Sequence, residues 1–428
     1  MANTVGVGML GLGTVGTAVA RRLIGEWELL GERAGVTPVL RRVAVRDASK
    51  TRDVDLKNAE LCTDPFAVID DAAITIVVEV MGGVDGTLPL IERALRAGKT
   101  VVTANKALMA AHGRALWRLA ADQRAGLWFE AAVGAGLPII GLLRDSLRGD
   151  RVQSIDSIIN GTTNVILTRM RRHGSTLSEA LTDAQARGFA EADPSADVDG
   201  WDAAQKLVLM ARLAFDADIG LDDVVVMGIR DLDRVDMGYT GQLGYSVKLL
   251  AQARSDGGTL HLRVRPTLIP EGHDLFDVGD SDNAVRIRSD LAGTVLLRGL
   301  GAGGDSTASA VVSDVVNAVR RTGSQPAPPM STRPHIQNAD DVETAGYIRV
   351  RIGDGADAGA LVVQALEDRG LDVQHVVEKP PIDGPFPQLL VLTGTAPRAV
   401  HRGALETLDT LAVVHEVACA LDRLEEPA

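Results

Sequence analysis

The order of apolar and polar positions in the first third of the chain predicts strands that alternate with helices. Apolar runs such as Val5–Leu10 and Ile74–Val80 are typical of buried parallel strands. Between them, apolar residues recur at helical spacing. This alternation predicts a doubly wound α/β fold with a parallel sheet. We expect strands at 5–10, 39–45, 74–80, 100–102 and 127–129, and helices at 14–30, 88–97 and 108–124.

The pattern changes after about Pro138. A helix at 139–147 leads into a strand at 152–159, and helices then predominate to about residue 215. Two strands joined by SDGGT, 247–253 and 260–269, predict a hairpin. Further strands at 284–288 and 294–299 and a helix at 307–320 complete a second, α+β domain.

The last quarter of the chain is set off by a segment rich in proline. Residues 322–334 contain four of the 17 prolines and no periodicity, which is typical of a linker. After it, the pattern reads strand, helix, strand, strand, helix, strand, the order of a ferredoxin-like fold. The six elements are expected at 347–352, 358–369, 373–377, 388–393, 397–408 and 412–420.

Composition excludes several classes of protein. The net charge of −13 over 428 residues argues against nonspecific binding to nucleic acid or anionic lipid. The two cysteines, Cys62 and Cys419, form neither a disulfide framework nor a zinc motif, so we expect a cytoplasmic protein. The N-terminus lacks a basic region, and no apolar run reaches 18 residues, so we expect neither a signal peptide nor a membrane span.

A glycine-rich turn, GLGTVG at Gly11–Gly16, directly follows the first strand and opens a helix. This context turns a weak motif into a dinucleotide-binding fingerprint. Gly11 allows the tight turn, Gly13 lets the backbone approach a pyrophosphate at the helix N-terminus, and Gly16 allows close packing of helix on strand. Leu12, Thr14 and Val15 complete the turn.

The residue after the second strand bears on the choice between NAD and NADP. The strand ends VAVRD, with Arg46 at its tip and Asp47 behind it. An arginine here can pair with a 2′-phosphate, which favours NADP(H). The alternative is a solvated Arg46 with Asp47 bound to the ribose of NAD(H).

A third group of polar residues lies at Gly188–Ala211. Glu191 precedes a turn, and Asp202 and Lys206 lie four residues apart on the next helix, so they share one face. A carboxylate and a lysine presented in this way can hold a small zwitterion and exchange a proton with it. The opposite face is apolar and should be buried; it carries Ala203, Leu207, Met210, Ala211 and Ala214.

Several of these motifs, taken in order, resemble those of homoserine dehydrogenases. The resemblance covers residues 5–320 and is carried by VTANKAL (102–108), FEAAVGAGLPII (129–140), NGTTNVIL (160–167), GFAEADPSADVDGWDAAQK (188–206) and GAGGDSTASAV (301–311). It implies NAD(P)H-dependent interconversion of L-aspartate 4-semialdehyde and L-homoserine, on the route to threonine, methionine and isoleucine.

The resemblance also implies roles for single residues. Lys206 would be the proton donor, Asp202 would bind the reacting oxygen or orient a lysine, and Lys106 would lie near the nicotinamide and the substrate. Glu191 would bind the substrate ammonium. Further contacts are implied to the substrate carboxylate at the amides of Gly161 and Thr162 and to the cofactor at Gly188 and Gly303. A monovalent cation, usually Na⁺, would be bound by the backbone carbonyls of Glu130, Val133, Ala135 and Leu137.

The C-terminal part resembles an ACT domain, a fold that binds amino acids and often mediates inhibition by threonine. Its first loop, GDGADAGAL, lacks the usual proline, so a threonine site and a purely oligomeric role both remain open. We expect a dinucleotide-binding domain at 1–135, completed by 303–321, and a substrate and dimerisation domain at 136–302. A linker at 322–345 and an ACT-like domain at 346–428 would follow. The resemblance implies a homodimer or homotetramer.

Other functions stay open at this point. Another aldehyde or hydroxy-acid dehydrogenase could share this architecture, and an inactive sensor of nucleotide and amino acid is a different class. The joint presence of Glu191, Asp202, Lys206 and Lys106 disfavours a sensor, which has no need of a proton-transfer lysine. No kinase-sized segment precedes the glycine turn, so we expect a monofunctional enzyme.

Overall fold

The computed structural model describes residues 4–321, 333–353, 355, 357–382 and 384–425. Residues 322–332, the first part of the segment predicted as a linker, lie outside this part of the chain. The chain forms two compact units, and each is made of three segments. The first unit comprises residues 1–155, 204–223 and 281–334, and the second comprises 156–203, 224–280 and 335–428.

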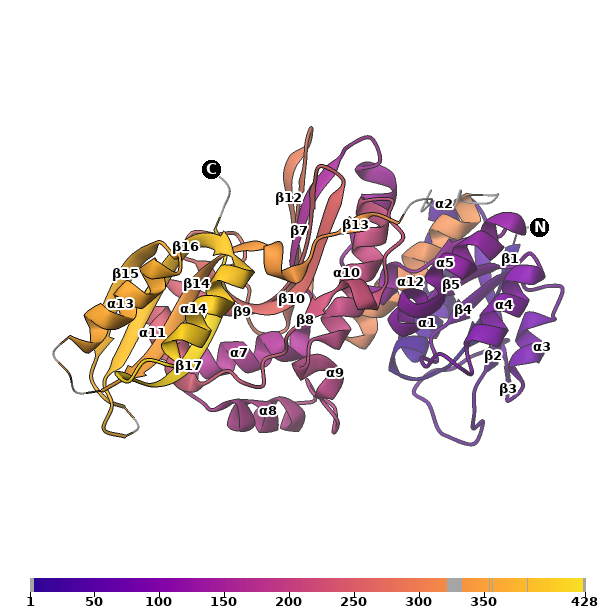
Figure 1. Ribbon diagram of the computed structural model, residues 1–428. Helices are drawn as coiled ribbons and strands as arrows, with labels where there is room; N and C mark the ends of the chain where they lie inside the picture. Colours follow the sequence, from indigo (N-terminus) through magenta and orange to yellow (C-terminus); the bar gives the residue numbers. More distant parts are fainter. Residues whose placement is uncertain (1–3, 322–332, 354, 356, 383, 426–428) are drawn as a thin grey trace. The chain divides into compact units, whose positions relative to one another are not determined.

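A six-stranded parallel sheet organises the first unit (Figure 1). Its strand order is β3-β2-β1-β4-β5-β6, the order of a dinucleotide-binding sheet, so the predicted doubly wound fold is confirmed. The carboxyl ends of β1 and β4 flank the point where the order reverses, which is where such sheets bind ligands. The strands are β1 (Thr4–Leu10), β2 (Thr37–Ala44), β3 (Glu60–Cys62), β4 (Ile76–Glu79), β5 (Thr100–Thr103) and β6 (Leu127–Trp128).

Helices from distant parts of the sequence cover this sheet. They are α1 (Thr14–Gly25), α2 (Trp27–Ala34), α3 (Pro65–Ile69), α4 (Leu88–Arg96), α5 (Lys106–Asp122) and α12 (Gly304–Arg320). Buried residues of α12, such as Val311 and Val315, share one hydrophobic cluster with Val7 of β1 and Val19 of α1. The helix that comes last in the sequence of this unit is therefore part of the core of its sheet.

Two predicted helices differ from the observed ones. The helix expected at 14–30 is interrupted at Glu26, whose φ and ψ of −118° and 28° are not helical. Gly25 precedes the interruption, and glycine has a low helix propensity. Trp27, the residue that follows the interruption, is 49% exposed. The helix expected at 139–147 begins as α6 (Ile139–Gly141) and continues as a π-helix at Leu142–Ser146.

The first unit also contains a hairpin of β11 (Asp282–Ser289) and β12 (Gly293–Leu300), which confirms the strands predicted there.

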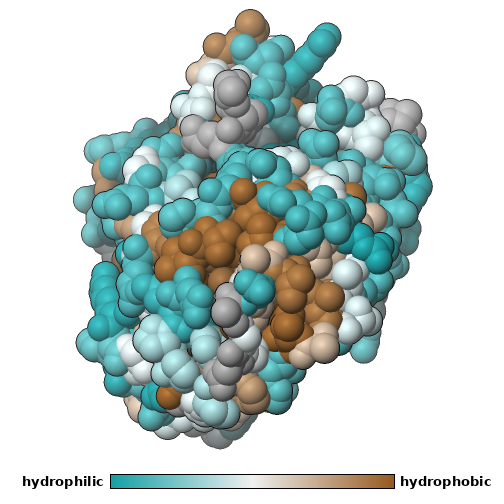
Figure 2. Space-filling model, turned by 60° about the vertical axis from the view of Figure 1, so that its left-hand side comes forward, coloured by the Kyte–Doolittle hydropathy of each residue, from teal (hydrophilic) through white to brown (hydrophobic). Residues whose placement is uncertain are grey.

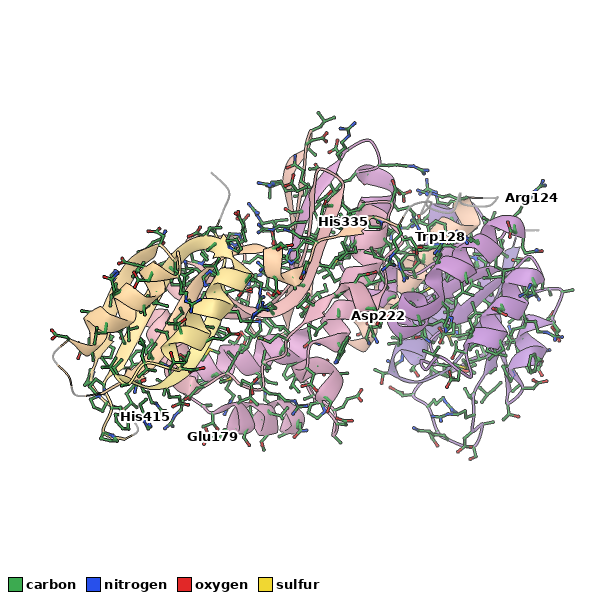
Figure 3. All side chains as sticks on the ribbon, in the orientation of Figure 1. Arg124, Trp128, Glu179, Asp222, His335 and His415 are labelled. Atoms are coloured by element: carbon green, nitrogen blue, oxygen red, sulfur yellow. The ribbon has the colours of Figure 1, made fainter. Side chains whose placement is uncertain are left out.

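Trp128, labelled in Figure 3, ends β6, and the guanidinium of Arg144 stacks 4.3 Å from its ring centroid. This cation–π contact holds the π-helical segment against the end of the sheet.

The second unit contains a mixed sheet in the order β7-β9-β10-β17-β14-β16-β15. The predicted hairpin is confirmed as the antiparallel pair β9 (Tyr245–Asp256) and β10 (Thr259–Pro270). Two short strands, β8 (Val225–Val226) and β13 (His335–Ile336), pair with β10, and β7 spans Val152–Ile158. The helices are α7 (Gly161–His173), α8 (Leu177–Ala186), α9 (Ser195–Val198) and α11 (Arg234–Gln242); α10 (Trp201–Ala214) begins in this unit.

The six C-terminal elements occur in the predicted order and form what we call the C-terminal module. They are β14 (Glu343–Ile352), α13 (Ala358–Asp368), β15 (Val373–Lys379), β16 (Gln388–Pro397), α14 (Arg398–Leu408) and β17 (Val414–Arg423). The strand order β17-β14-β16-β15 is antiparallel throughout, as in a ferredoxin-like sheet. β17 also pairs in parallel with β10 through Thr267 and Asp422.

A buried ion pair attaches the module to α11. The carboxylate of Asp236 accepts hydrogen bonds from Arg349 Nε at 2.7 Å and Nη2 at 2.8 Å, and from Tyr347 Oη at 2.9 Å. All three side chains are buried. Because a buried charge without its partner is costly, this contact fixes α11 to β14.

Figure 2 shows one face of the molecule, where hydrophobic side chains gather near the middle and are surrounded mostly by hydrophilic residues. Among the described residues, no helix has both the length and the apolar character needed to cross a membrane.

Candidate active site

Of the three glycines of the turn after β1, Gly11 and Gly16 lie where a side chain would collide with the backbone, and Gly13 lies beside open space. Gly11 has φ of +101°, and a Cβ added there would lie 2.8 Å from the Val80 carbonyl oxygen. A Cβ at Gly16 would lie 2.5 Å from the Gly11 carbonyl oxygen, so only glycine lets α1 pack this closely. A Cβ at Gly13 would meet no protein atom within 4 Å. The space beside Gly13 is therefore open to a ligand.

The N-terminus of α1 is suited to an anion. Gly13 is the N-cap and provides no side-chain cap, and the first turn, which contains Thr14 and Val15, has no acidic residue. The amide groups and the positive end of the helix dipole thus face the open side of the turn. Gly303, with φ of +118°, begins α12, and a Cβ at the next residue, Gly304, would lie 2.9 Å from Thr14 Cγ2.

The tip of β2 carries Arg46 and Asp47, both exposed. The Asp47 carboxylate accepts hydrogen bonds from Ser49 Oγ at 2.6 Å and Ser49 N at 2.9 Å, and these bonds lower the pKa of Asp47. Arg52, which the sequence reasoning missed, donates from Nε to the Leu12 carbonyl at 3.2 Å and from Nη2 to the Asp47 carbonyl at 2.8 Å. This arginine ties the loop after β2 to the glycine turn.

A buried carboxylate organises the ends of β4 and β5. Glu79 accepts hydrogen bonds from Met81 N at 2.8 Å, Gly82 N at 3.1 Å and Thr103 Oγ1 at 2.5 Å. Burial raises the pKa of Glu79, which is wholly enclosed. The sequence reasoning missed this residue, although an acid inside the apolar run ITIVVEV was the available signal.

Lys106 is presented by the same edge of the sheet. Asn105 caps α5 by accepting a hydrogen bond from Leu108 N, and its side-chain amide donates to the Gly83 carbonyl at 2.6 Å. Lys106 is then the first residue of α5 and is half-buried. The loops after β4 and β5 are thereby joined. They present Lys106 at the carboxyl edge of the sheet, the same edge that carries the glycine turn after β1.

The segment predicted to hold a cation forms a compact, mostly buried loop. Glu130, Val133, Ala135 and Leu137 are all buried, and Ala135 has φ of +52°, which is unusual for alanine. The Glu130 and Leu137 carbonyls also accept hydrogen bonds from Val133 N and Ile139 N. A carbonyl oxygen has two lone pairs and can still face a cation.

The acidic side chains near this loop accept hydrogen bonds from backbone amides of the protein. The Glu130 carboxylate accepts hydrogen bonds from Ile140 N at 2.8 Å and Gly141 N at 2.7 Å, and Glu130 N donates to Asp314 at 2.8 Å. Burial and the nearby Glu130 raise the pKa of Asp314 to about 8. The described residues contain no group of three or more His, Cys, Asp or Glu side chains placed to hold a metal ion. A cation here would therefore be held by carbonyl oxygens.

In the second unit, Asn160 joins the start of α7 to Asp202. Its Oδ1 accepts a hydrogen bond from Thr163 N, which caps α7, and its Nδ2 donates to Asp202 at 2.8 Å and to Asp197 at 2.6 Å. Asp202 is buried, and Lys206 follows one helical turn later on α10. Of the face expected to be buried, Ala203, Leu207, Met210 and Ala211 are buried and Ala214 is partly exposed.

The first helical amides of α7 lie beside the loop that carries Glu191. Gly161 and Thr162 are the first two residues of α7, and its first turn has no acidic residue. Thr162 Oγ1 donates to the Phe189 carbonyl at 2.8 Å, one residue after Gly188, whose φ is +76°. Gln185 donates to the Glu191 carbonyl at 2.9 Å, and Glu191 is exposed. The structure therefore joins Gly161, Thr162 and Asp202 to the 188–191 loop.

The predicted site residues are divided between the two units. Apart from Gly188, the cofactor residues belong to the first unit, together with Lys106 and the cation loop; Gly161, Thr162, Gly188, Glu191 and Asp202 belong to the second. Asn160 and Asp197 were missed by the sequence reasoning. The signal for Asn160 was its place before a predicted helix, where asparagine is a preferred N-cap.

Comparisons with known proteins agree with this architecture. The family model for homoserine dehydrogenase matches residues 138–316, and the model for its NAD-binding domain matches residues 11–130. A homoserine dehydrogenase of Synechocystis is 40% identical over 97% of this chain and 98% of its own.

The chain belongs to the homoserine dehydrogenase family.

Solved structures support the same assignment. A homoserine dehydrogenase from Thiobacillus denitrificans matches with a TM-score of 0.93 and 35% identity, over 99% of this chain and 100% of the other. A hyperthermophilic archaeal homoserine dehydrogenase in complex with NADPH matches with a TM-score of 0.61 and 30% identity, over 74% of this chain and 97% of the other. This homoserine dehydrogenase family member is therefore an oxidoreductase with a pyridine nucleotide cofactor.

The glycine turn supplies a matched pair of variants. Gly13→Ala should weaken nucleotide binding by about tenfold, because its methyl group fills the space where the backbone meets the pyrophosphate. Its melting temperature should stay near that of the wild type, since the added Cβ meets no protein atom within 4 Å. Gly16→Ala should lower the melting temperature, because its Cβ would collide with the Gly11 carbonyl. NADPH fluorescence titration and thermal unfolding test both, and wild-type affinity in Gly13→Ala would contradict the assignment.

Proposed function

We propose that this protein interconverts L-aspartate 4-semialdehyde and L-homoserine with NADP(H) as the preferred cofactor, in the biosynthesis of threonine, methionine and isoleucine. The observation that carries the proposal is the buried Asp202, held by Asn160 beside the N-terminus of α7, with Lys206 one turn further along α10. Family membership supplies the reaction, and this arrangement supplies groups that fit its substrate.

The substrate is a small zwitterion that carries an aldehyde or a hydroxyl group. The exposed carboxylate of Glu191 fits its ammonium, and the amides of Gly161 and Thr162, at the positive end of α7, fit its carboxylate. Asp202 is proposed to bind the reacting oxygen or to orient a lysine. Lys106, at the carboxyl edge of the parallel sheet, is proposed to contact nicotinamide and substrate.

The proposed chemistry needs one proton transfer from the protein. When bound, the reduced nicotinamide supplies a hydride to the aldehyde carbon. Lys206 gives its proton to the oxygen, which would otherwise carry the full negative charge of an alkoxide. In the oxidative direction, Lys206 takes the proton from the hydroxyl group. Gly188 and Gly303, both with positive φ, are proposed to let the backbone come close to the cofactor.

The preference for NADP(H) rests on charge at the tip of β2. Arg46 is exposed there, and an arginine is the residue that best matches a phosphate. In the NAD(H)-binding alternative, Asp47 would accept from the ribose through Oδ2, because both hydrogen bonds from Ser49 go to Oδ1.

We propose that a monovalent cation, Na⁺, binds the backbone carbonyls of Glu130, Val133, Ala135 and Leu137.

We also propose that the C-terminal module is an ACT domain with L-threonine as its effector. Its candidate effector loop is the first loop of the module, Asp354–Ala360, of which Asp354 and Ala356 lie outside the described residues. We keep the domain bounds predicted from the sequence, 1–135 with 303–321, 136–302 and 346–428, with residues 322–345 as the linker.

A homodimer, with a tetramer as the larger form, is proposed for the assembly. The edge strand β12 presents Leu296 and Leu300, which are 40% and 58% exposed. An apolar edge strand of this kind is prone to pair with another chain.

The first test is the steady-state oxidation of L-homoserine by NADP⁺ and NAD⁺ in parallel, with and without L-threonine. We expect turnover, a higher kcat/KM with NADP⁺, and inhibition by threonine. Absence of turnover with both cofactors, in protein that binds NADPH, would contradict the proposed reaction. Turnover unaffected by threonine would contradict the effector role of the module and leave its oligomeric role.

Lys206→Ala should lower kcat by about 10²- to 10⁴-fold, the usual contribution of a positioned general acid. The dissociation constant of NADPH should change little. Gln205→Ala, the adjacent half-buried residue of α10, is the matched control and should keep most of its activity. If Lys206→Ala keeps most of the wild-type kcat, another group donates the proton.

Arg46→Ala should weaken NADPH binding by about tenfold and leave NADH binding within about twofold, because only NADPH carries the 2′-phosphate. Arg41→Ala, which removes an exposed arginine of β2 itself, should change neither affinity. Both affinities can be measured by fluorescence titration at constant ionic strength. Equal losses for both nucleotides in Arg46→Ala would rule out the 2′-phosphate contact.

A further inference from the structure

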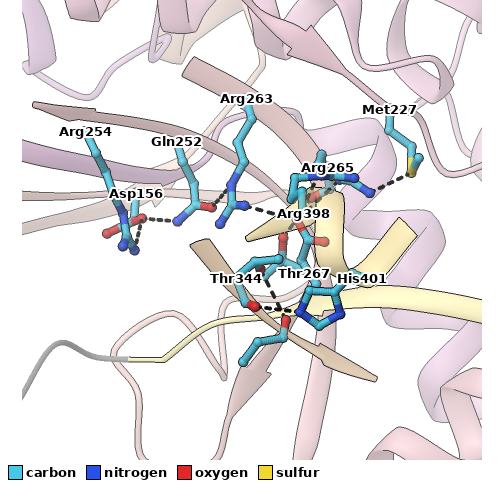
Figure 4. A network of polar contacts seen from close by, with 12 residues as sticks. Asp156, Met227, Gln252, Arg254, Arg263, Arg265, Thr267, Thr344, Arg398 and His401 are labelled. Atoms are coloured by element: carbon cyan, nitrogen blue, oxygen red, sulfur yellow. Dashed lines mark hydrogen bonds and ion pairs between the residues drawn. The ribbon is translucent and has the colours of Figure 1, made fainter. Parts of the chain in front are cut away.

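A cavity of about 260 Å³ lies in the second unit, where the C-terminal module meets β10. Arg265 of β10 lines one side of it, and Arg398, His401 and Arg402 of α14 line another. We call this cavity the arginine pocket; Figure 4 shows Arg265, Arg398 and His401 converging on it from different elements. No residue of the candidate effector loop lines it.

Positive charge around the arginine pocket exceeds negative charge. Asp422 Oδ2 lies 3.1 Å from Arg263, 3.4 Å from Arg265 and 3.5 Å from Arg398, so three guanidinium groups share one carboxylate. The next acid along the network, Asp156, is 3.8 Å from a further arginine, Arg254. Four guanidinium groups thus face two carboxylates.

The other titratable groups at the pocket do not restore the balance. Arg402 and Asp340 neutralise each other through hydrogen bonds of 2.6 and 2.9 Å. His401 Nε2 lies 2.8 Å from the Thr344 carbonyl oxygen, and burial lowers the pKa of this histidine. The pKa of His261 on β10 is lowered to about 3. Burial is the largest cause, and the positive charges of Arg263, Arg254 and Arg398 lower it further.

Arg265 has few acceptors for its donors. Its side chain is 6% exposed, and its Nε, although 3.4 Å from Asp422 Oδ2, makes no hydrogen bond with the described residues. Its Nη2 contacts the sulfur of Met227 at 3.5 Å, a weak acceptor. A buried guanidinium has five N–H donors, and leaving them unpaired is costly. This side chain therefore points to a missing acceptor in the pocket.

The start of α14 adds to the attraction for an anion. Arg398 is its first residue, Pro397 provides no side-chain cap, and the first turn contains no acidic residue. The positive end of this helix dipole therefore adds to the charge of the arginines. Ile348 and Leu405 make part of the wall apolar.

We propose that the arginine pocket binds a small oxyanion, either a phosphate group or the carboxylate of a short organic acid. Guanidinium groups recognise both through paired hydrogen bonds. The bound anion accepts from Arg265 and balances the charge shared by Arg263, Arg265 and Arg398. Because these arginines belong to β10 and α14, the anion also stabilises the junction between the C-terminal module and β10. This site does not depend on the proposed reaction.

The test is calorimetric titration of the full chain, saturated with NADPH, with inorganic phosphate and separately with butyrate, at constant ionic strength in chloride. We expect saturable binding of at least one anion. Affinity should fall at least about tenfold in Arg265→Gln and in Arg398→Gln, since each variant removes one charged donor. Arg93→Gln, which removes an arginine paired with Asp70 in the first unit, is the control and should bind like the wild type.

The outcomes separate the two sources of the anion. Tighter binding of phosphate indicates a phosphorylated or inorganic ligand, and tighter binding of butyrate indicates an organic acid that uses the apolar wall. Arg398, whose side chain is 24% exposed, tolerates substitution better than the buried Arg265, so the test stands if Arg265→Gln does not fold. Absence of saturable binding by both anions, or wild-type affinity in Arg398→Gln, would overturn the proposal.

Discussion

The part of this protein that we propose to bind the substrate depends on the side chain of Asn160. Its oxygen caps α7, and its nitrogen binds Asp202 and Asp197, so one amide connects α7, α9 and α10. Asp202 is buried, and a buried carboxylate without such donors is costly. The same hydrogen bonds that stabilise the carboxylate also fix it relative to the first amides of α7. Structural stability and presentation of the groups that we propose to bind the substrate therefore rest on the same contacts.

The part proposed to bind the nucleotide depends on two features, the backbone of the glycine turn after β1 and the buried carboxylate of Glu79. The glycine turn after β1 can be this tight only because Gly11 and Gly16 lack a Cβ, and the space beside Gly13 is open. Glu79 performs the corresponding task for β4 and β5 by binding two backbone amides and Thr103. In both parts, buried polar groups satisfy one another and leave the catalytic candidates at the edges of rigid elements, where a ligand can reach them.

Much of the fold was predictable because it depends on local patterns. The parallel sheet, the β9–β10 hairpin and the six elements of the C-terminal module follow from periodic apolar residues and turn residues, which act over a few positions. The predictions failed where a short-range competition decided the outcome. Gly25 interrupts the first helix, and the 139–147 segment turns into a π-helix where Arg144 stacks on Trp128. Neither the stacking partner nor its geometry can be read from the spacing of residues.

The sequence by itself determined the chemistry that the chain carries: the glycine turn, the acid and lysine on one face of α10, and the family to which they belong. These features belong to short motifs, whose residue types and spacing can be read directly from the amino-acid sequence. Only the tertiary structure decided which polar groups meet after folding. Asn160 and Asp202 are 42 residues apart, Arg349 and Asp236 are 113 apart, and Arg263 and Asp422 are 159 apart. Pairing across such distances is selected by the cost of burying a charge alone, and that cost depends on the packing of the whole chain.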